Sequence, residues 1–104
     1  MLKDGYCKKE LDGWLVWLRR VNNSLSFART WKEYENGFGR PDGNFWLGLE
    51  HLHTLTNTGD WMFRAEMESW KGEMKWVEYK NFCISDKTDN YRLILTGYMM
   101  NAVQ

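Results

Sequence analysis

The spacing of the apolar residues changes partway along the chain, and this change restricts the fold to one that mixes helices and strands. Leu49, Leu52 and Leu55 recur every three residues, which is typical of one face of a helix. From Trp61 to Glu68, bulky apolar residues instead occupy every second position, which predicts a half-buried strand. A chain of 104 residues makes one domain. Helices and strands must therefore share a single core.

Further strand-like segments flank this strand, and turn residues separate them. A turn at Trp70-Lys71-Gly72-Glu73 predicts an antiparallel hairpin with the return strand that follows it, and a polar loop at Asp86–Asn90 precedes the last strand. The predicted strands cover residues 14–20, 61–68, 74–79 with an extension over 82–84, and 91–96.

Two short helices complete the predicted architecture. Thr30 and Glu33 have the spacing of a capping box, so we expect a helix of about two turns after Thr30. We expect Gly37 to end it in a left-handed conformation. A second helix is predicted from Leu47 to Thr56. The order of elements predicts an α+β fold with two short helices and a largely antiparallel sheet.

Composition excludes several classes of protein. Fourteen Lys and Arg balance fourteen Asp and Glu, which argues against a nucleic-acid partner. The longest apolar run, Trp14–Leu18, is far shorter than the roughly 20 residues of a membrane span. Charged residues follow Met1, so we expect no signal peptide in this chain. Seven Trp, five Tyr and five Phe predict an aromatic core, and we expect most of the Trp residues to lie in it.

The sequence offers no convincing catalytic or metal-binding pattern. His51 and His53 are two apart on a predicted helix and would point to nearly opposite sides, so we expect one exposed imidazole and one that is hydrogen-bonded. Glu66 and Glu68 share a strand face, which is more typical of a charged surface than of a catalytic carboxylate pair. We therefore expect no catalytic residue, no metal ligand, and a non-enzymatic binding or structural domain.

Two features depend on the cellular compartment. Cys7 and Cys83 lie far apart and match no zinc or redox motif, so they pair with each other, pair with segments absent here, or remain free as buried thiols. We weight the last two possibilities above the first. Asn22-Asn23-Ser24 is an acceptor tripeptide for N-glycosylation, which matters only if the chain is secreted.

Several consecutive motifs resemble the fibrinogen C-terminal domain, which ficolins, tenascins and angiopoietins share. The most specific combination is WKEYENGFG at residues 31–39 followed closely by FWLGLE at residues 45–50. The resemblance runs from about Tyr6 to Tyr98. It also includes Asp12-Gly13-Trp14, the segment from Arg64 to Gly72, and Tyr91-Arg92-Leu93.

This resemblance implies that residues 1–104 form only the N-terminal and central portions of such a domain. The family's calcium-binding loop and ligand pocket would lie beyond Gln104, so we expect no calcium or other cofactor in this chain. Cys7 resembles the second cysteine of the family's first disulfide, whose partner would precede Met1, whereas Cys83 is an additional thiol. Asn22 remains the candidate glycosylation site.

The family also implies a function. We expect an extracellular recognition or receptor-ligand module that binds a carbohydrate or a cell-surface receptor, and to which this chain contributes mainly scaffold. Oligomers would form only in a longer protein with an upstream stalk. The alternatives are a fragment of an angiopoietin-like signalling ligand, or a truncated product without independent binding activity.

Overall fold

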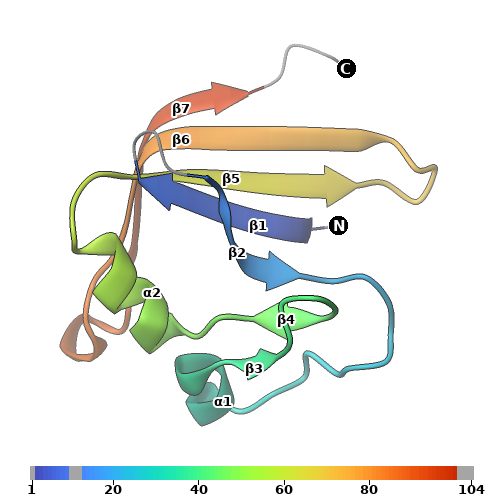
Figure 1. The fold of residues 1–104 in the computed structure, drawn as a ribbon, viewed down its shortest axis with the longest axis horizontal. Helices are drawn as coiled ribbons and strands as arrows, with labels where there is room; N and C mark the ends of the chain where they lie inside the picture. Colours follow the sequence, from blue (N-terminus) through green and yellow to red (C-terminus); the bar gives the residue numbers. More distant parts are fainter. Residues whose placement is uncertain (1, 10–12, 101–104) are drawn as a thin grey trace.

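A single antiparallel sheet of seven strands organises the protein, and two short helices pack beside it (Figure 1). The computed structural model describes residues 2–9 and 13–100. The strand order is β3-β4-β2-β1-β5-β6-β7. The elements are β1 (Leu2–Lys9), β2 (Leu15–Arg19), α1 (Trp31–Asn36), β3 (Phe38–Gly39), β4 (Phe45–Trp46), α2 (Leu49–Thr56), β5 (Trp61–Glu68), β6 (Met74–Ile84), a 3-10 turn η1 (Lys87–Asp89) and β7 (Leu93–Met100). The predicted α+β class with a largely antiparallel sheet is confirmed.

Strand β1 lies in the middle of the sheet, although the sequence analysis predicted no strand there. It pairs with β2 on one side and with β5 on the other. Gly5 is essential to this position, because a Cβ atom there would lie 2.4 Å from the indole ring of Trp17. Because the segment contains charged residues and a glycine, it lacks the alternation of apolar residues that predicts a strand. Its hydrogen bonds to β2 and β5 define it as one.

The core lies where the middle of the sheet meets the helices. Phe63 and Ala65 are buried together with Trp61 on alternate positions of β5, which confirms the predicted period of two. The ring of Trp17 lies 5.5 Å from that of Phe63 and 6.4 Å from that of Phe82, measured between ring centroids. Cys7, Leu18, Leu52, Ile84 and Tyr91 are the other buried apolar residues.

Strand β6 is longer than its amino-acid pattern indicates. It continues for 11 residues through Lys80 and Asn81, so the predicted return strand and its extension form one strand. Its far end turns toward α2, where Phe82 and Ile84 are buried (Figure 1). The last strand begins at Leu93 rather than at Tyr91, because residues 86–91 form the η1 turn and a compact loop.

The first helix begins as predicted but ends differently. The hydroxyl of Thr30 accepts from the N–H of Glu33, and the Glu33 carboxylate accepts from the N–H of Thr30, so the capping box is confirmed. Gly37 has φ 94° and ψ 159°, which is not the left-handed helical conformation that we expected. The chain instead extends at once into β3.

The second helix begins at Leu49, two residues later than predicted. Phe45 and Trp46 form the short strand β4, which pairs with both β2 and β3, so that Leu47 and Gly48 connect this strand to the helix instead of forming its first residues. Gly48 precedes the helix with φ 113°, and a Cβ atom there would lie 2.8 Å from the carbonyl carbon of Asn36. The glycine therefore allows the end of α1 and the start of α2 to approach closely.

One buried hydroxyl joins α2 to the sheet. Thr56 accepts a hydrogen bond from the N–H of Ile84 on β6 and donates one to the carbonyl of Leu52. Both distances are ordinary, at 3.0 and 2.7 Å. The helix is thus fixed to the sheet by a polar contact as well as by apolar packing.

Candidate functional site

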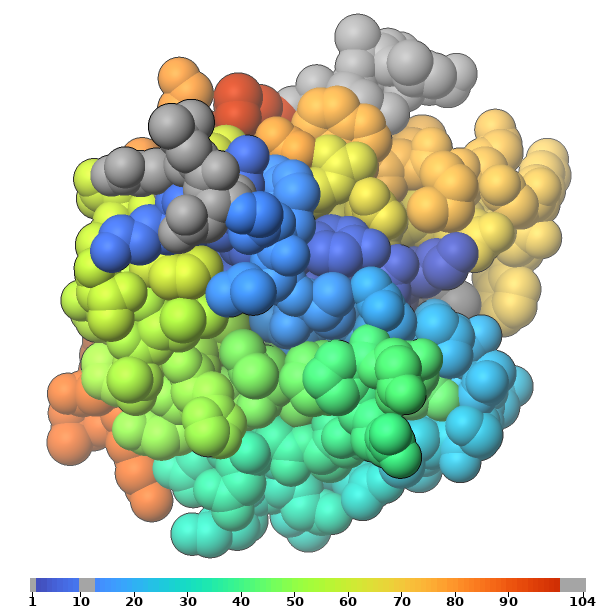
Figure 2. Space-filling view, viewed as in Figure 1, coloured from blue at the N-terminus to red at the C-terminus, as the bar shows by residue number. Residues whose placement is uncertain are grey.

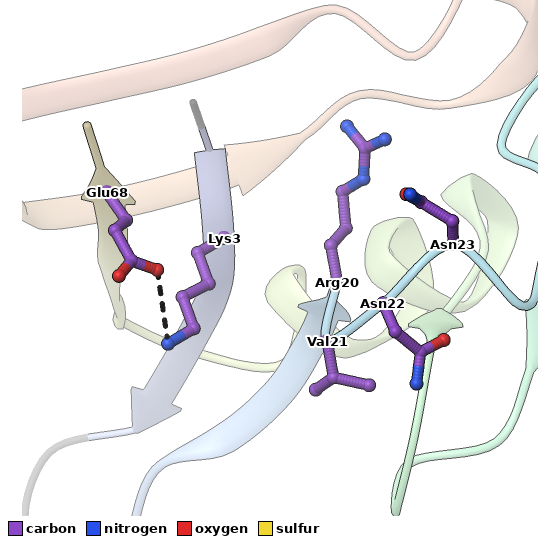
Figure 3. A pocket seen from close by; sticks show the side chains of 6 residues that line it. All are labelled: Lys3, Arg20, Val21, Asn22, Asn23 and Glu68. Atoms are coloured by element: carbon purple, nitrogen blue, oxygen red, sulfur yellow. Dashed lines mark ion pairs between the residues drawn. The ribbon is translucent and has the colours of Figure 1, made fainter. Parts of the chain in front are cut away.

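A polar hollow lies where the N-terminal strand meets the loop after β2 (Figure 3). Lys3 on β1 and Glu68 at the end of β5 form one wall, and their charged groups are 3.5 Å apart. The other lining residues are Arg20, Val21, Asn22 and Asn23. The hollow therefore brings the candidate glycosylation residue close to an ion pair from two adjacent strands.

Asn44 holds the loop that carries Asn22. Its side-chain oxygen accepts from the N–H groups of Val21 and Asn22, at 2.8 and 3.3 Å. Its side-chain nitrogen donates to the oxygen of Asn22 at 2.8 Å and to the hydroxyl of Ser24 at 3.1 Å. The sequence analysis missed Asn44; its position directly after the turn residues Pro41-Asp42-Gly43 was the available signal.

The acceptor tripeptide itself lies at the surface in a defined turn. Asn22 and Ser24 are both exposed, and the N–H of Ser24 donates to the side-chain oxygen of Asn22 at 2.9 Å. The oxygen of the Asn22 amide is thus fixed by two donors, from Ser24 and Asn44. This geometry leaves the asparagine accessible and orients its side chain.

The two cysteines occupy different environments, and they do not form a disulfide with each other. Cys7 is completely buried in the core, and burial raises the pKa of its thiol to about 12. Cys83 is partly exposed on β6, and its sulfur lies 3.6 Å from the side-chain oxygen of Asn57. The structure therefore excludes the internal pair in this conformation. A free buried thiol describes Cys7, whereas Cys83 is not fully buried as that alternative expected.

The two histidines behave as their spacing predicted. His51 is exposed, whereas Nδ1 of His53 lies 2.9 Å from the carbonyl oxygen of Ile84. Within the residues that the structure describes, no cluster of three or more His, Cys, Asp or Glu side chains could hold a metal ion.

The two glutamates on the outer face of β5 are also engaged by basic residues. Arg64 contacts both Glu66 on its own strand and Glu78 on β6, and its guanidinium lies 4.6 Å from the ring centroid of Trp76. Glu68 faces Lys3. The carboxylates are therefore parts of a charged sheet surface, as the sequence analysis favoured.

A second hollow, larger than the polar one, is apolar and lies between β2, the turn before β4, and α2. Its volume is about 860 Å³. Trp14 and Leu15 line it from the start of β2 and are exposed, and Leu55 faces it from α2. Phe45 and Leu47 complete the apolar lining. A surface of this kind, with large side chains open to solvent, is typical of a contact with another polypeptide segment.

Comparison with known proteins identifies the fold that carries these surfaces. The model of the C-terminal globular domain of fibrinogen beta and gamma chains matches residues 4–104. The chain belongs to the fibrinogen C-terminal domain family. The spatial arrangement agrees: the fibrinogen-like globe domain of human ANGPTL6 superposes with a TM-score of 0.80 and 38% sequence identity.

Related sequences come from the angiopoietin branch of this fibrinogen-like family. Angiopoietin-4 from Bos taurus is 38% identical over 99 residues, which cover 93% of this chain and 20% of that protein. Human angiopoietin-related protein 7 is 40% identical over 98 residues, which cover 92% of this chain and 28% of that protein. The superposition with the ANGPTL6 globe domain covers 93% of this chain and 45% of that domain's chain. The chain thus spans less than half of the fibrinogen-like structure that it matches.

The family match and the lengths of the helices bear on two broader points. The fibrinogen C-terminal domain family is non-enzymatic. Across residues 2–9 and 13–100, no helix is both long enough and apolar enough to cross a membrane.

Proposed function

We propose that this chain is the scaffold portion of an extracellular fibrinogen-like recognition module, and that residues 1–104 make up only part of the domain. The observation that carries the proposal is the apolar hollow beside β2 and α2. This hollow of about 860 Å³, lined in part by Trp14, Leu15 and Phe45, is open to solvent, while the match extends over less than half of a related domain. The natural occupant is the part of the domain that follows in the relatives.

The angiopoietin relatives favour a cell-surface receptor over a carbohydrate as the final partner. The relatives named above are an angiopoietin and an angiopoietin-related protein, and each matches more than nine-tenths of this chain. In this proposal the receptor-contacting groups, any calcium site and the oligomerising stalk lie outside the chain. The chain supplies the sheet on which they are positioned.

A complementation experiment tests the scaffold role. The chain is mixed with the separately produced remainder of the human ANGPTL6 globe domain, and light scattering after gel filtration measures the complex. We expect a 1:1 complex, and we expect Leu15→Glu to abolish it because the charge would be buried in the hollow. Leu93→Glu is the matched control, since Leu15 and Leu93 are similarly exposed, at 47% and 52%, but Leu93 lies on β7.

Two results would contradict the scaffold role: no association at any concentration, or equal weakening by both substitutions. Binding to receptor-bearing cells forms a second arm of the experiment. We expect labelled chain to bind cells only when the complementary part is present. Cell binding by the chain alone, at the same level, would place the recognition surface within residues 1–104.

Two covalent modifications belong to the same proposal. We propose that Cys7 forms a disulfide with an upstream cysteine in a longer protein, and that Asn22 carries an N-linked glycan in the secretory pathway. The exposed turn at Asn22–Ser24 supports the second modification. Mass spectrometry of a longer form secreted by animal cells, with and without glycosidase, checks both. An unmodified Asn22 or a free Cys7 thiol there would contradict the corresponding proposal.

A further inference from the structure

The acceptor tripeptide at residues 22–24 is held by a buried side chain from another part of the chain. Asn44 lies directly before β4 and is only 7% exposed. Its side chain makes four hydrogen bonds, and all four end on residues 21–24. Two of them run from its side-chain nitrogen to the side-chain oxygen of Asn22 and to the hydroxyl of Ser24. We call these four hydrogen bonds the Asn44 network.

The backbone donors around Asn44 determine the orientation of both amide groups. The N–H groups of Val21 and Asn22 donate to one branch of the Asn44 amide, so this branch is the oxygen and the other is the nitrogen. The branch of Asn22 that receives this nitrogen is then an oxygen, and the N–H of Ser24 reaches the same atom. Nδ2 of Asn22, the atom that would carry a glycan, takes no part in these hydrogen bonds.

We propose that the Asn44 network withholds the tripeptide from the glycosylating enzyme, so that Asn22 is modified before β4 folds against β2. This inference rests on the proposed glycosylation of Asn22. In the reaction, Nδ2 forms a bond to the first sugar of a lipid-linked oligosaccharide diphosphate. The bond from that sugar to the diphosphate breaks, the lipid diphosphate leaves, and one hydrogen of Nδ2 passes as a proton through the enzyme to solvent.

The enzyme needs the groups that Asn44 engages. An oligosaccharyltransferase binds the hydroxyl at the third position of the tripeptide together with the asparagine amide. In the folded chain the Ser24 hydroxyl accepts from Asn44 at 3.1 Å, and the Asn22 oxygen accepts from it at 2.8 Å. Lifting the tripeptide into an enzyme site breaks at least these two hydrogen bonds. Their loss corresponds to a population of open tripeptide that is about 30-fold smaller.

Asn44 reaches the tripeptide only through the folded segment before β4. The N–H of Arg40 donates to the backbone carbonyl of Asn44 at 2.9 Å, and the next residue, Phe45, pairs with Arg19 at the end of β2. Asn22 precedes Asn44 by 22 positions. The tripeptide therefore stays open in a growing chain until β4 has been translated and has paired with β2.

The same network accommodates the glycan once it is attached. A glycosylated asparagine keeps its side-chain oxygen and loses only one hydrogen of Nδ2, so every bond of the Asn44 network can still form. The side chain of Asn22 is exposed, which leaves room for the sugar outside the loop. The folded loop therefore holds the product of the reaction and resists the reaction itself.

Glycosylation of the purified chain, after it has folded, tests this inference. The chain is produced in bacteria without glycans and is then mixed with a purified oligosaccharyltransferase and a lipid-linked oligosaccharide. Gel mobility before and after glycosidase treatment measures the rate of modification. We expect the folded chain to react about 30-fold more slowly than a synthetic peptide of residues 18–28, which lacks Asn44.

Asn44→Asp separates the role of Asn44 from the general stability of the fold. Aspartate still accepts from the N–H groups of Val21 and Asn22, but its carboxylate cannot donate to the side-chain oxygen of Asn22. We expect this variant to react at least about fivefold faster than wild type, the change that one ordinary hydrogen bond produces. Asn81→Asp makes the same change at an exposed position of β6, and Thr56→Val removes a buried hydrogen bond outside this loop. Both controls should react as slowly as wild type.

Three results would overturn the inference. The first is a folded wild-type chain that is modified as fast as the peptide, and the second is an Asn44→Asp variant that is modified no faster than wild type. The third is an equal acceleration in Thr56→Val, because a general loss of stability would then explain the change. A peptide that is not modified at all would instead contradict the glycosylation proposed for Asn22, and the inference with it.

Discussion

Trp17 and Trp70 have the same side chain in opposite surroundings. Trp17 is 7% exposed, and its ring packs on Gly5 and against Trp46 and Phe63. Trp70 is 98% exposed at the tip of the β5–β6 hairpin, which projects from the body of the molecule (Figure 2). Our expectation that most Trp residues lie in the core was therefore wrong in part, since Trp14 and Trp31 are exposed as well.

The difference shows that aromatic content identifies neither the core nor the free surface. Trp17 is buried because two neighbouring strands and a glycine leave a space of its shape. Trp70 follows Ser69 in a tight turn, where the N–H of Gly72 donates to the carbonyl of Ser69. Backbone hydrogen bonds therefore fix the conformation of this turn, and the indole ring of Trp70 does not contribute to it. Stability should consequently depend on the first region and hardly at all on the second.

The substitution Trp17→Ala should have the largest effect on stability, and it tests whether the region around Trp17 is the core. Removing the ring leaves a cavity against Gly5, Phe63 and Phe82, so we expect a loss of about 3–5 kcal/mol in the free energy of unfolding. Denaturant unfolding followed by circular dichroism measures the change. A loss below about 1 kcal/mol would mean that this region is not the core.

The thiol of Cys7 provides a pH-dependent test of the same region. Burial raises its pKa from 9.0 to about 12, so its contribution to stability is complete below about pH 9 and is lost as pH rises toward 12. We expect a decline of about 1.4 kcal/mol for each pH unit above 9 from this group. Unfolding measured across this range should show that Cys7→Ala reduces the slope, and an unchanged slope in that variant would contradict the prediction.

Thr56→Val tests the polar connection between the core and α2. Valine keeps the shape of threonine but leaves the N–H of Ile84 without its acceptor, so we expect a loss of about 1–3 kcal/mol. Denaturant unfolding is again the measurement. Thr54→Val, at an exposed position of the same helix, is the matched control, and an equal effect there would contradict the role of the hydrogen bond.

Thr30→Ala tests how much the N-terminal cap of α1, which lies outside the core, contributes to stability. It removes one half of the capping box of α1, which should cost about 1 kcal/mol. Hydrogen exchange of the first-turn amides should increase along with the loss of stability. An unchanged exchange rate at Glu33 would show that packing rather than the cap holds the helix start.

The smallest effect should come from Trp70→Ala. Because its ring is exposed and the turn is held by backbone contacts, we expect a change within about 0.5 kcal/mol. Denaturant unfolding beside Trp17→Ala gives the direct contrast. A larger loss would indicate that the indole packs on the hairpin in solution.

Local chemistry explains which elements the sequence could predict. The capping box at Thr30 and Glu33 involves residues three apart, and the alternation from Trp61 to Glu68 reflects one strand with one buried face. The behaviour of His51 and His53 likewise followed from helix geometry. Each of these features depends on residues a few positions apart, so it can be predicted without knowing which segments pack against it.

The remaining features depend on partners that are distant in sequence. Strand β1 carries too few apolar residues to be recognised, and only pairing with β2 and β5 defines it. Asn44 matters because it reaches the loop of Asn22, and Tyr91 because Glu35 lies 56 positions away along the chain. No spacing rule links such residues, so the hydrogen bond from Asn44 to Asn22 and the one from Tyr91 to Glu35 are visible only in the three-dimensional structure.

The position of β1 has a consequence for biosynthesis. The hairpin of β1 and β2 can form early, but the other edge of β1 waits for β5, whose residues begin at Trp61. While the nascent chain emerges from the ribosome, that edge offers unpaired amide and carbonyl groups. Two growing polypeptides could pair with each other through this edge until β5 has been translated as far as Glu68. Fast translation of this segment would shorten that interval, and a chaperone bound to the edge would prevent the pairing.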